Sequence, residues 1–254
     1  MPTPTLAMQE RHDYKRPPIM EAVIELQFSQ ALDADSVNKT QKLFSKNFSI
    51  IQAISQIEIQ LNQNTQASSI THKPSGYRMD NSDSTDIISI TNAAIAYSRL
   101  APYSGWNLFS AAALMAFDDF RKEIGFVQLK RIGLRYINRI DIPLPSLGEI
   151  VRLENYLTIQ PQYPEDSFPP LQGFTMQNVF GLANNEGSAT ITVASVPSPL
   201  PIHMGIILDI DVARSQNLPK SQSDTRDLLN IMRDEKNSVF ESCITKATRE
   251  LFDR

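Results

Sequence analysis

Charged side chains on two predicted strands are the residues of this sequence whose types and spacing could do chemistry. They are Glu21, Glu25, Arg135, Arg139 and Asp141. Two carboxylates can act as general acid and base when a cleft perturbs their pKa values. Two guanidinium groups can bind a carboxylate or phosphate bidentately, so this set could hold a small polar anionic ligand. The simpler interpretation is a structural cross-strand ladder of opposite charges that contains no catalytic residue.

The two strands that carry these charges are recognised by alternation. Apolar residues occupy every second position of 19–28, which leaves both glutamates together on the other face. Pro18 precedes this strand and disfavours a helix there, and Ala22 lies on its apolar face. The segment 130–142 alternates in the same way, with Tyr136 and Asn138 on the face opposite the two arginines. A buried asparagine needs hydrogen-bond partners, so Asn138 is a second polar position of interest.

Further elements follow from the spacing of apolar residues, which is three to four in helices and two in strands. Helices are predicted at about 35–48, with Asp33 or Asp35 as N-cap, at 104–125, at about 149–157 and at 224–252. Additional strands are predicted at 56–61, near Tyr77, and at 85–91, 94–100, 173–182, 188–196 and 203–212, with a hairpin turn at 184–187.

These elements predict an α+β fold, in which an antiparallel sheet is covered by two long helices. The order strand, short helix, several strands and long helix occurs twice, which predicts an internal duplication. Residues 1–16 are polar and aperiodic, and we expect a flexible N-terminal tail there. A single domain should follow over 17–254, made of two similar halves at about 17–126 and 127–254.

Composition disfavours several classes of partner and compartment. With 24 Lys+Arg against 28 Asp+Glu and a net charge of −4, the chain lacks the basic character that drives nucleic-acid binding. No apolar run approaches the roughly 20 residues of a membrane span, and the N-terminal segment lacks the apolar stretch of a signal peptide. We therefore expect no membrane partner. The single cysteine, Cys243, falls at an apolar helical position, which favours a core residue in a reducing cytoplasm.

Motifs for cofactors, metals and nucleotides are missing from the sequence. His12, His72 and His203 stand apart from one another, and no C-x-x-C or H-E-x-x-H pairing supplies a metal-ligand set. Neither a Gly-rich phosphate loop nor a G-x-S-x-G nucleophile motif occurs. We therefore expect no cofactor and no metal.

Three segments carry a resemblance to a known family. They are RPPIMEAVIELQFS at 16–29, IGLRYINRIDIP at 132–143 and FESCITKATRELF at 240–252. In this order they resemble a sporadically distributed family of uncharacterised bacterial proteins that open with a Pro-Pro-x-x-Glu-Ala strand and carry a central Leu-Arg-Tyr-x-Asn-Arg-Ile segment. The resemblance implies a bacterial or phage-related cytoplasmic protein and implies no activity or catalytic residue.

Three hypotheses of function follow. The leading one is a non-enzymatic binding or interaction protein, such as an accessory or sensor component, because a large scaffold carries no standard catalytic motif. The first alternative is an enzyme of unfamiliar type that acts on a phosphorylated or carboxylated small molecule through the Glu/Arg strand face. The second alternative is a structural subunit of a homo-oligomer, joined through sheet edges or the closing helix.

Overall fold

The structure is a computed structural model that describes residues 12–61, 68–144, 151–162, 169, 171–182 and 186–253. For 56–61 and 68–73 it describes the backbone only. Residues 1–11 of the predicted tail, the side chain of His72, the first part of the helix predicted at 149–157 and residues 184–185 of the turn predicted at 184–187 lie outside this description.

The chain alternates between strands and helices, and β2 and β3 run longer than their patterns predicted. In order, the elements are β1 (Ile19–Phe28), α1 (Ala34–Phe44), β2 (Ile50–Leu61), β3 (Ser68–Asp80), β4 (Asp86–Thr91), β5 (Ala94–Leu100), α2 (Trp106–Ile124), β6 (Leu129–Pro143), the 3-10 helix η1 (Leu153–Asn155), β7 (Thr175–Gly181), β8 (Gly187–Pro197), β9 (His203–Arg214), α3 (Gln222–Cys243) and α4 (Lys246–Phe252).

The strands form one nine-stranded sheet in the order β2-β3-β4-β5-β1-β6-β9-β8-β7. Pairing is antiparallel from β2 to β5 and from β6 to β7. An antiparallel sheet accompanied by helices confirms the coarse α+β prediction. The chain divides into two compact units. Unit 1 comprises 1–23, 100–104 and 132–254, and unit 2 comprises 24–99 and 105–131.

The predicted covering of the sheet by two long helices is wrong. The described residues form four α-helices, and the two long ones belong to different units, where α2 lies against α1 and α3 lies against β9. The predicted duplication is also not found. Between β6 and β7 the described residues form only the three-residue η1 where a second short helix was expected, and the chain closes on two helices. Periodicity identifies an element's type but not the surface it covers, so it could not determine this arrangement.

Unit 1 is built on the inward faces of β6, β9 and β8. Alternate residues of these strands are buried, as the period of two requires. Buried examples are Leu134, Tyr136 and Ile140 of β6, Leu208 and Ile210 of β9, and Ile191 and Val193 of β8. The apolar stripe of α3 is buried too, through Leu229, Met232, Val239, Phe240 and Cys243. The other face of these strands carries the polar side chains.

Unit 2 is likewise built from strands with a buried face, here β1, β4 and β5, together with the helices α1 and α2. Phe28 at the end of β1 stacks on Phe120 of α2, with ring centroids 5.6 Å apart. Asp33 is the N-cap of α1, because its side chain accepts a hydrogen bond of 2.7 Å from the Ser36 N–H. Gly125 ends α2 with φ of 89°, a conformation that suits glycine.

The prediction of one helix at 224–252 is wrong, because the helix is broken at Ile244. Ile244 is extended and forms a β-bridge with Leu157, and the Thr245 N–H donates to the Tyr156 carbonyl at 3.0 Å. The Thr245 hydroxyl donates to the Asn155 carbonyl at 2.6 Å. These tertiary bonds replace helical ones, and the apolar periodicity continues through the break because α4 buries Phe252.

Candidate functional site

Three of the four predicted strand-face charges of unit 1 are engaged in ion pairs, namely Arg135, Arg139 and Asp141. Arg135 of β6 binds Asp209 of β9 with both ends of its guanidinium group, with Nε 2.9 Å from Oδ1 and Nη2 2.5 Å from Oδ2. This hydrogen bonding raises the pKa of Arg135 further, and the charge of Glu21 on β1 contributes a smaller increase. Glu21 itself has no hydrogen bond or ion pair among the described residues.

Arg139 and Asp141 pair with each other farther along β6. The Arg139 Nε donates to Asp141 Oδ1 at 3.1 Å, and its Nη2 donates to the Pro197 carbonyl at 3.1 Å. The Ser198 hydroxyl donates to the same carboxylate at 2.7 Å. The Arg139 backbone N–H donates to the Pro18 carbonyl at 2.8 Å, so two positions of the family-like motifs meet through the backbone.

Glu25 belongs to unit 2, where it pairs with an arginine that sequence reasoning did not select. Arg131 donates to Glu25 at 3.0 Å, and Gln27 donates to the same carboxylate at 2.7 Å. Arg131 could have been found, because it lies four residues before Arg135 on the same face of the strand. Within each unit, a ligand anion at these arginines would have to displace a carboxylate that is already bound.

The motif positions on the opposite strand face are interior. Ala22, Tyr136 and Asn138 are buried. The Asn138 amide donates to the Leu208 carbonyl at 3.0 Å and to the Tyr136 carbonyl at 3.3 Å, which satisfies its donors within the sheet. The hydroxyl of Tyr136 lies 2.8 Å from that of Tyr103. Burial, followed by the neighbouring Tyr103, raises the pKa of Tyr136.

Lys236 of α3 is the most unusual ionisable group of unit 1. Its Nζ lies 3.8 Å from the centre of the Tyr136 ring, and only 7% of the residue is exposed. Burial, together with the charge of Arg233, lowers the pKa of Lys236 to about 7, and the charge of Glu241 acts in the opposite direction. Lys236 lies four residues after Met232 and therefore within the apolar stripe, which is a signal that sequence reasoning could have used.

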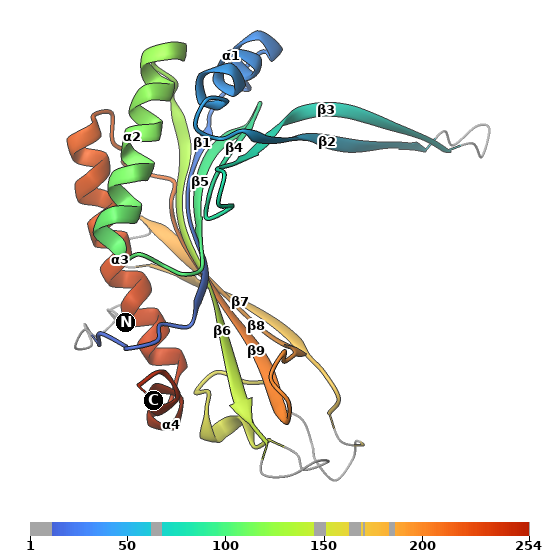
Figure 1. Ribbon diagram of the computed structural model, residues 1–254, viewed down its shortest axis with the longest axis vertical. Coiled ribbons are helices and arrows are strands. Elements are labelled where there is room, and N and C mark those ends of the chain that lie inside the picture. The colour runs from blue at the N-terminus through green and yellow to red at the C-terminus, as the bar shows by residue number, and fades with distance from the viewer. Residues whose placement is uncertain are drawn as a thin grey trace. The chain divides into compact units, whose positions relative to one another are not determined.

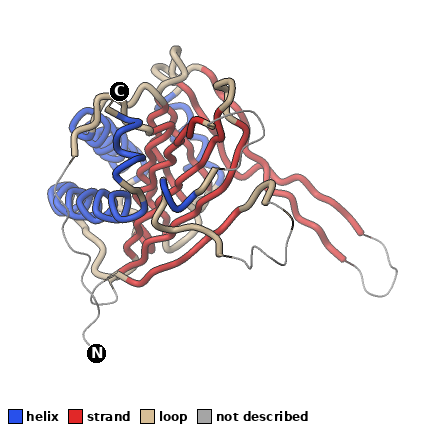
Figure 2. The backbone as a smooth tube through the Cα atoms, turned by 90° about the horizontal axis from the view of Figure 1, so that it is seen from below, coloured by secondary structure: helices blue, strands red, loops and turns tan. Residues whose placement is uncertain are grey.

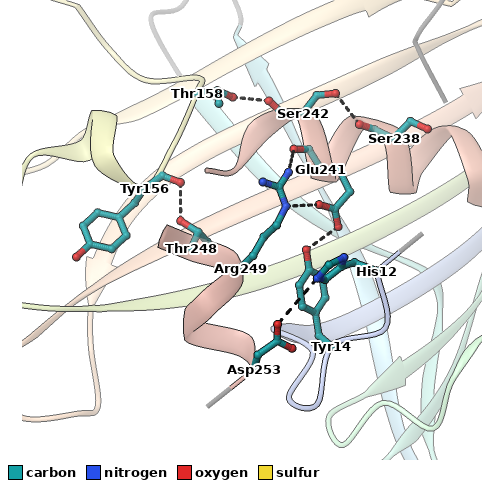
Figure 3. Close-up of polar contacts among 10 residues, drawn as sticks. All are labelled: His12, Tyr14, Tyr156, Thr158, Ser238, Glu241, Ser242, Thr248, Arg249 and Asp253. Atoms are coloured by element: carbon teal, nitrogen blue, oxygen red, sulfur yellow. Dashed lines mark hydrogen bonds and ion pairs between the residues drawn. The ribbon is translucent and has the colours of Figure 1, made fainter. Parts of the chain in front are cut away.

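A polar network joins the chain's two terminal segments within unit 1 (Figure 3). Glu241 of α3 accepts hydrogen bonds of 2.7 Å from the Tyr14 hydroxyl and of 2.7 Å from the Arg249 Nε. The Tyr14 ring meets Phe252 edge-on at 5.1 Å. Thr248 adds a hydrogen bond of 2.5 Å to the Tyr156 carbonyl. Each of these polar groups has a hydrogen-bond partner within the network. We therefore interpret the network as structural: it holds α4 against α3.

β2 and β3 form a two-stranded arm of unit 2. Figures 1 and 2 show the pair extending away from the other strands of this unit. β3 pairs with β4 only from Gly76 to Asp80, whereas it pairs with β2 over its whole length. Ile50 and Ile51 are neighbours that point to opposite faces, yet both are exposed, at 41% and 39%. Ile50 and Ile51 thus reach solvent on opposite faces of the ribbon, although Met79, which pairs with Ile51, is buried.

The described residues carry no sign of a metal site or a membrane span. No group of three or more His, Cys, Asp or Glu side chains there could hold a metal ion. None of the helices described is long and apolar enough to cross a membrane. No family model matches the chain, and no curated protein matches it either.

Proposed function

We propose that this protein is a non-enzymatic protein-binding component, an accessory or sensor subunit, and that the β2–β3 arm contacts its partner. The observation that carries this proposal is the arm itself, a two-stranded ribbon whose base exposes isoleucines on both faces. An isolated two-stranded ribbon is only marginally stable in water. A partner that covers such a ribbon gains both apolar burial and backbone pairing along the open edge of β2.

The state of the charged residues supports binding over catalysis. Arg135 and Arg139 are neutralised by Asp209 and Asp141, so the strand face offers an approaching anion no unsatisfied guanidinium group. The amine of Lys236 is buried against an aromatic ring, away from the surface where a substrate would approach. These contacts are those of a scaffold whose polar groups satisfy one another.

The setting that we propose is the bacterial cytoplasm. It is supported by the resemblance of the motifs at 16–29, 132–143 and 240–252, and by the burial of the free thiol of Cys243. Burial raises the pKa of this thiol to about 12, so the reactive thiolate is scarce at neutral pH.

The test shortens the arm without touching the rest of unit 2. Replacing residues 56–73 by Asn-Gly joins Ser55 to Pro74, which are paired in the ladder, through a two-residue hairpin turn. Immobilised full-length chain and shortened chain are exposed to lysate of the source bacterium, and each retained protein is purified and titrated against both. We expect a partner that binds the full-length chain and binds the shortened chain at least about tenfold more weakly.

A matched control leaves the arm intact and removes an exposed apolar side chain elsewhere, in the variant Met115→Ala on α2. This control should bind like the full-length chain. Equal binding by the shortened chain would contradict the role of the arm. Turnover of a nucleotide or ester substrate that disappears in Glu21→Ala would instead establish the enzymatic alternative.

A further inference from the structure

The outer edge of β7 in unit 1 pairs with no other strand of the described residues. β7 is the last strand in the sheet order and pairs with β8 without interruption from Thr175 to Gly181. Natural edge strands are usually protected by a charge, a proline or a bulge. The sequence TMQNVFG contains no charged residue and no proline, and the β7–β8 register shows no shift. Val179 and Phe180 are 67% and 48% exposed.

The hydrogen-bond pattern determines which backbone groups face outward. The Ser195 N–H donates to the Phe174 carbonyl, and the Leu182 N–H donates to the Gly187 carbonyl, each at 3.0 Å. Along an antiparallel ladder, residues whose backbone groups bond to the neighbouring strand alternate with residues whose backbone groups point away from it. The even-numbered residues of β7 therefore bond to β8. The backbone groups of the odd-numbered residues point away from the sheet, and these residues are Thr175, Gln177, Val179 and Gly181.

Asn178, at the centre of the strand, is incompletely satisfied. Its Nδ2 is buried and has no hydrogen-bond acceptor among the described residues. A buried amide donor without an acceptor is costly, and a native structure normally supplies one. Asn178 lies on the same strand face as Met176 and Phe180, since side chains alternate along a strand.

We infer that β7 pairs with β7 of a second copy of this chain, antiparallel and centred on Asn178. This register places Gln177 opposite Val179 of the second copy, and Thr175 opposite Gly181, so that all outward backbone groups are hydrogen-bonded. Asn178 then faces its own copy at a non-hydrogen-bonded position, where side chains approach most closely. Each amide gains an acceptor once its side chain turns toward the two-fold axis, and Met176 packs beside Phe180 of the second copy.

A second copy suits this edge better than an unrelated strand. Self-pairing of an uncharged strand brings no like charges together across the two-fold axis, although each chain carries a net charge of −4. The two-fold axis also makes Asn178 both donor and acceptor for its own counterpart, which an unrelated strand would match only with a side chain that both donates and accepts at the same position. This surface is separate from the β2–β3 arm, and the two proposals stand or fall independently.

The decisive variant is Val179→Pro, because the N–H it removes points outward and the β7–β8 ladder does not use it. Val179→Thr keeps the N–H and serves as its matched control. Mass is measured by sedimentation equilibrium at micromolar concentrations. We expect the wild type and Val179→Thr to have twice the chain mass of 28.5 kDa, and Val179→Pro to have the mass of one chain. A wild type that is monomeric throughout, or a Val179→Pro chain that stays dimeric, would overturn the inference.

A second variant tests the same interface in case the proline variant does not fold. Asn178→Asp is nearly isosteric and places two carboxylates face to face on the two-fold axis. We expect it to be monomeric at about pH 7.5 and to dimerise as the pH falls to about 4, through the ordinary carboxyl range. A dimer at both pH values would contradict the Asn178 register. The arm-shortened chain should remain dimeric, and its conversion to a monomer would assign self-association to the arm instead of β7.

Discussion

Replacing Lys236 by methionine should stabilise unit 1 at neutral pH and remove a pH dependence that the wild type shows. The pKa of Lys236 is about 7 in the folded chain and 10.5 in the unfolded one, a lowering that corresponds to about 5 kcal/mol. Below pH 7 the folded chain holds Lys236 as a charged amine in an apolar site. The full free-energy cost of burying this charge is therefore present below pH 7. Methionine retains the unbranched apolar stem and carries no charge.

The sign of the pH effect follows from proton binding. Between pH 7 and 10.5 the unfolded chain holds a proton on Lys236 that the folded chain has released, so stability rises with pH across this interval. Groups whose pKa is raised by folding make stability fall as the pH rises, but only at higher pH. Cys243 and Tyr97 are examples, because folding raises their pKa values to about 12 from 9.0 and 10.0. The range from pH 6 to about 8.5 therefore isolates the contribution of Lys236.

The measurement follows unit 1 through Cys243, whose buried thiol becomes available for labelling only on unfolding. Urea midpoints of the wild type and Lys236→Met are compared at equal pH, so that the pH dependence of labelling cancels. The increase in the urea midpoint of Lys236→Met over the wild type should be largest at about pH 6 and should shrink toward about pH 8.5. Lys246→Met, at an exposed position of α4, is the control and should change little. Parallel pH profiles for the wild type and Lys236→Met would refute a neutral buried amine.

Removing the partner of Arg214 should have the second large effect, in the destabilising direction. The Arg214 side chain is only 4% exposed, and its Nη2 lies 2.5 Å from both oxygens of Glu235. Glu235→Ala leaves a buried guanidinium group without its carboxylate, and losing one partner of a buried pair costs several kcal/mol. Because Glu235 is 26% exposed and water can reach the site, we expect a loss of about 3 kcal/mol in the stability of unit 1.

Two variants test whether this loss belongs to the ion pair. Glu235→Gln keeps one oxygen acceptor and removes the charge, so it should lose about half as much as alanine. Asp227→Ala removes an exposed carboxylate from the same helix and should stay within about 0.5 kcal/mol of the wild type. Both are measured by the urea midpoint of Cys243 labelling. A loss in Asp227→Ala equal to that in Glu235→Ala would point to general loss of charge on α3.

Local patterns were enough to determine the type of most elements. The alternation in 19–28 and 130–142 predicted β1 and β6 closely, because a sheet with one buried face admits apolar residues only at every second position. Asp33 and Gly125 marked helix ends, since their side-chain acceptor and positive φ act within one turn of the chain. These signals act within a few residues of the chain, so they can be recognised without knowledge of the fold.

Partners, by contrast, were decided only by tertiary structure. Arg135 binds Asp209, 74 positions away, because the register of β6 against β9 places them diagonally, and no local pattern specifies a register. The same holds for the break at Ile244, which depends on the distant Leu157, and for Lys236, whose pKa depends on burial against Tyr136. Sequence alone determined which residues of β1 and β6 face inward. Folding decided which of them meet, because long-range pairing depends on the whole chain.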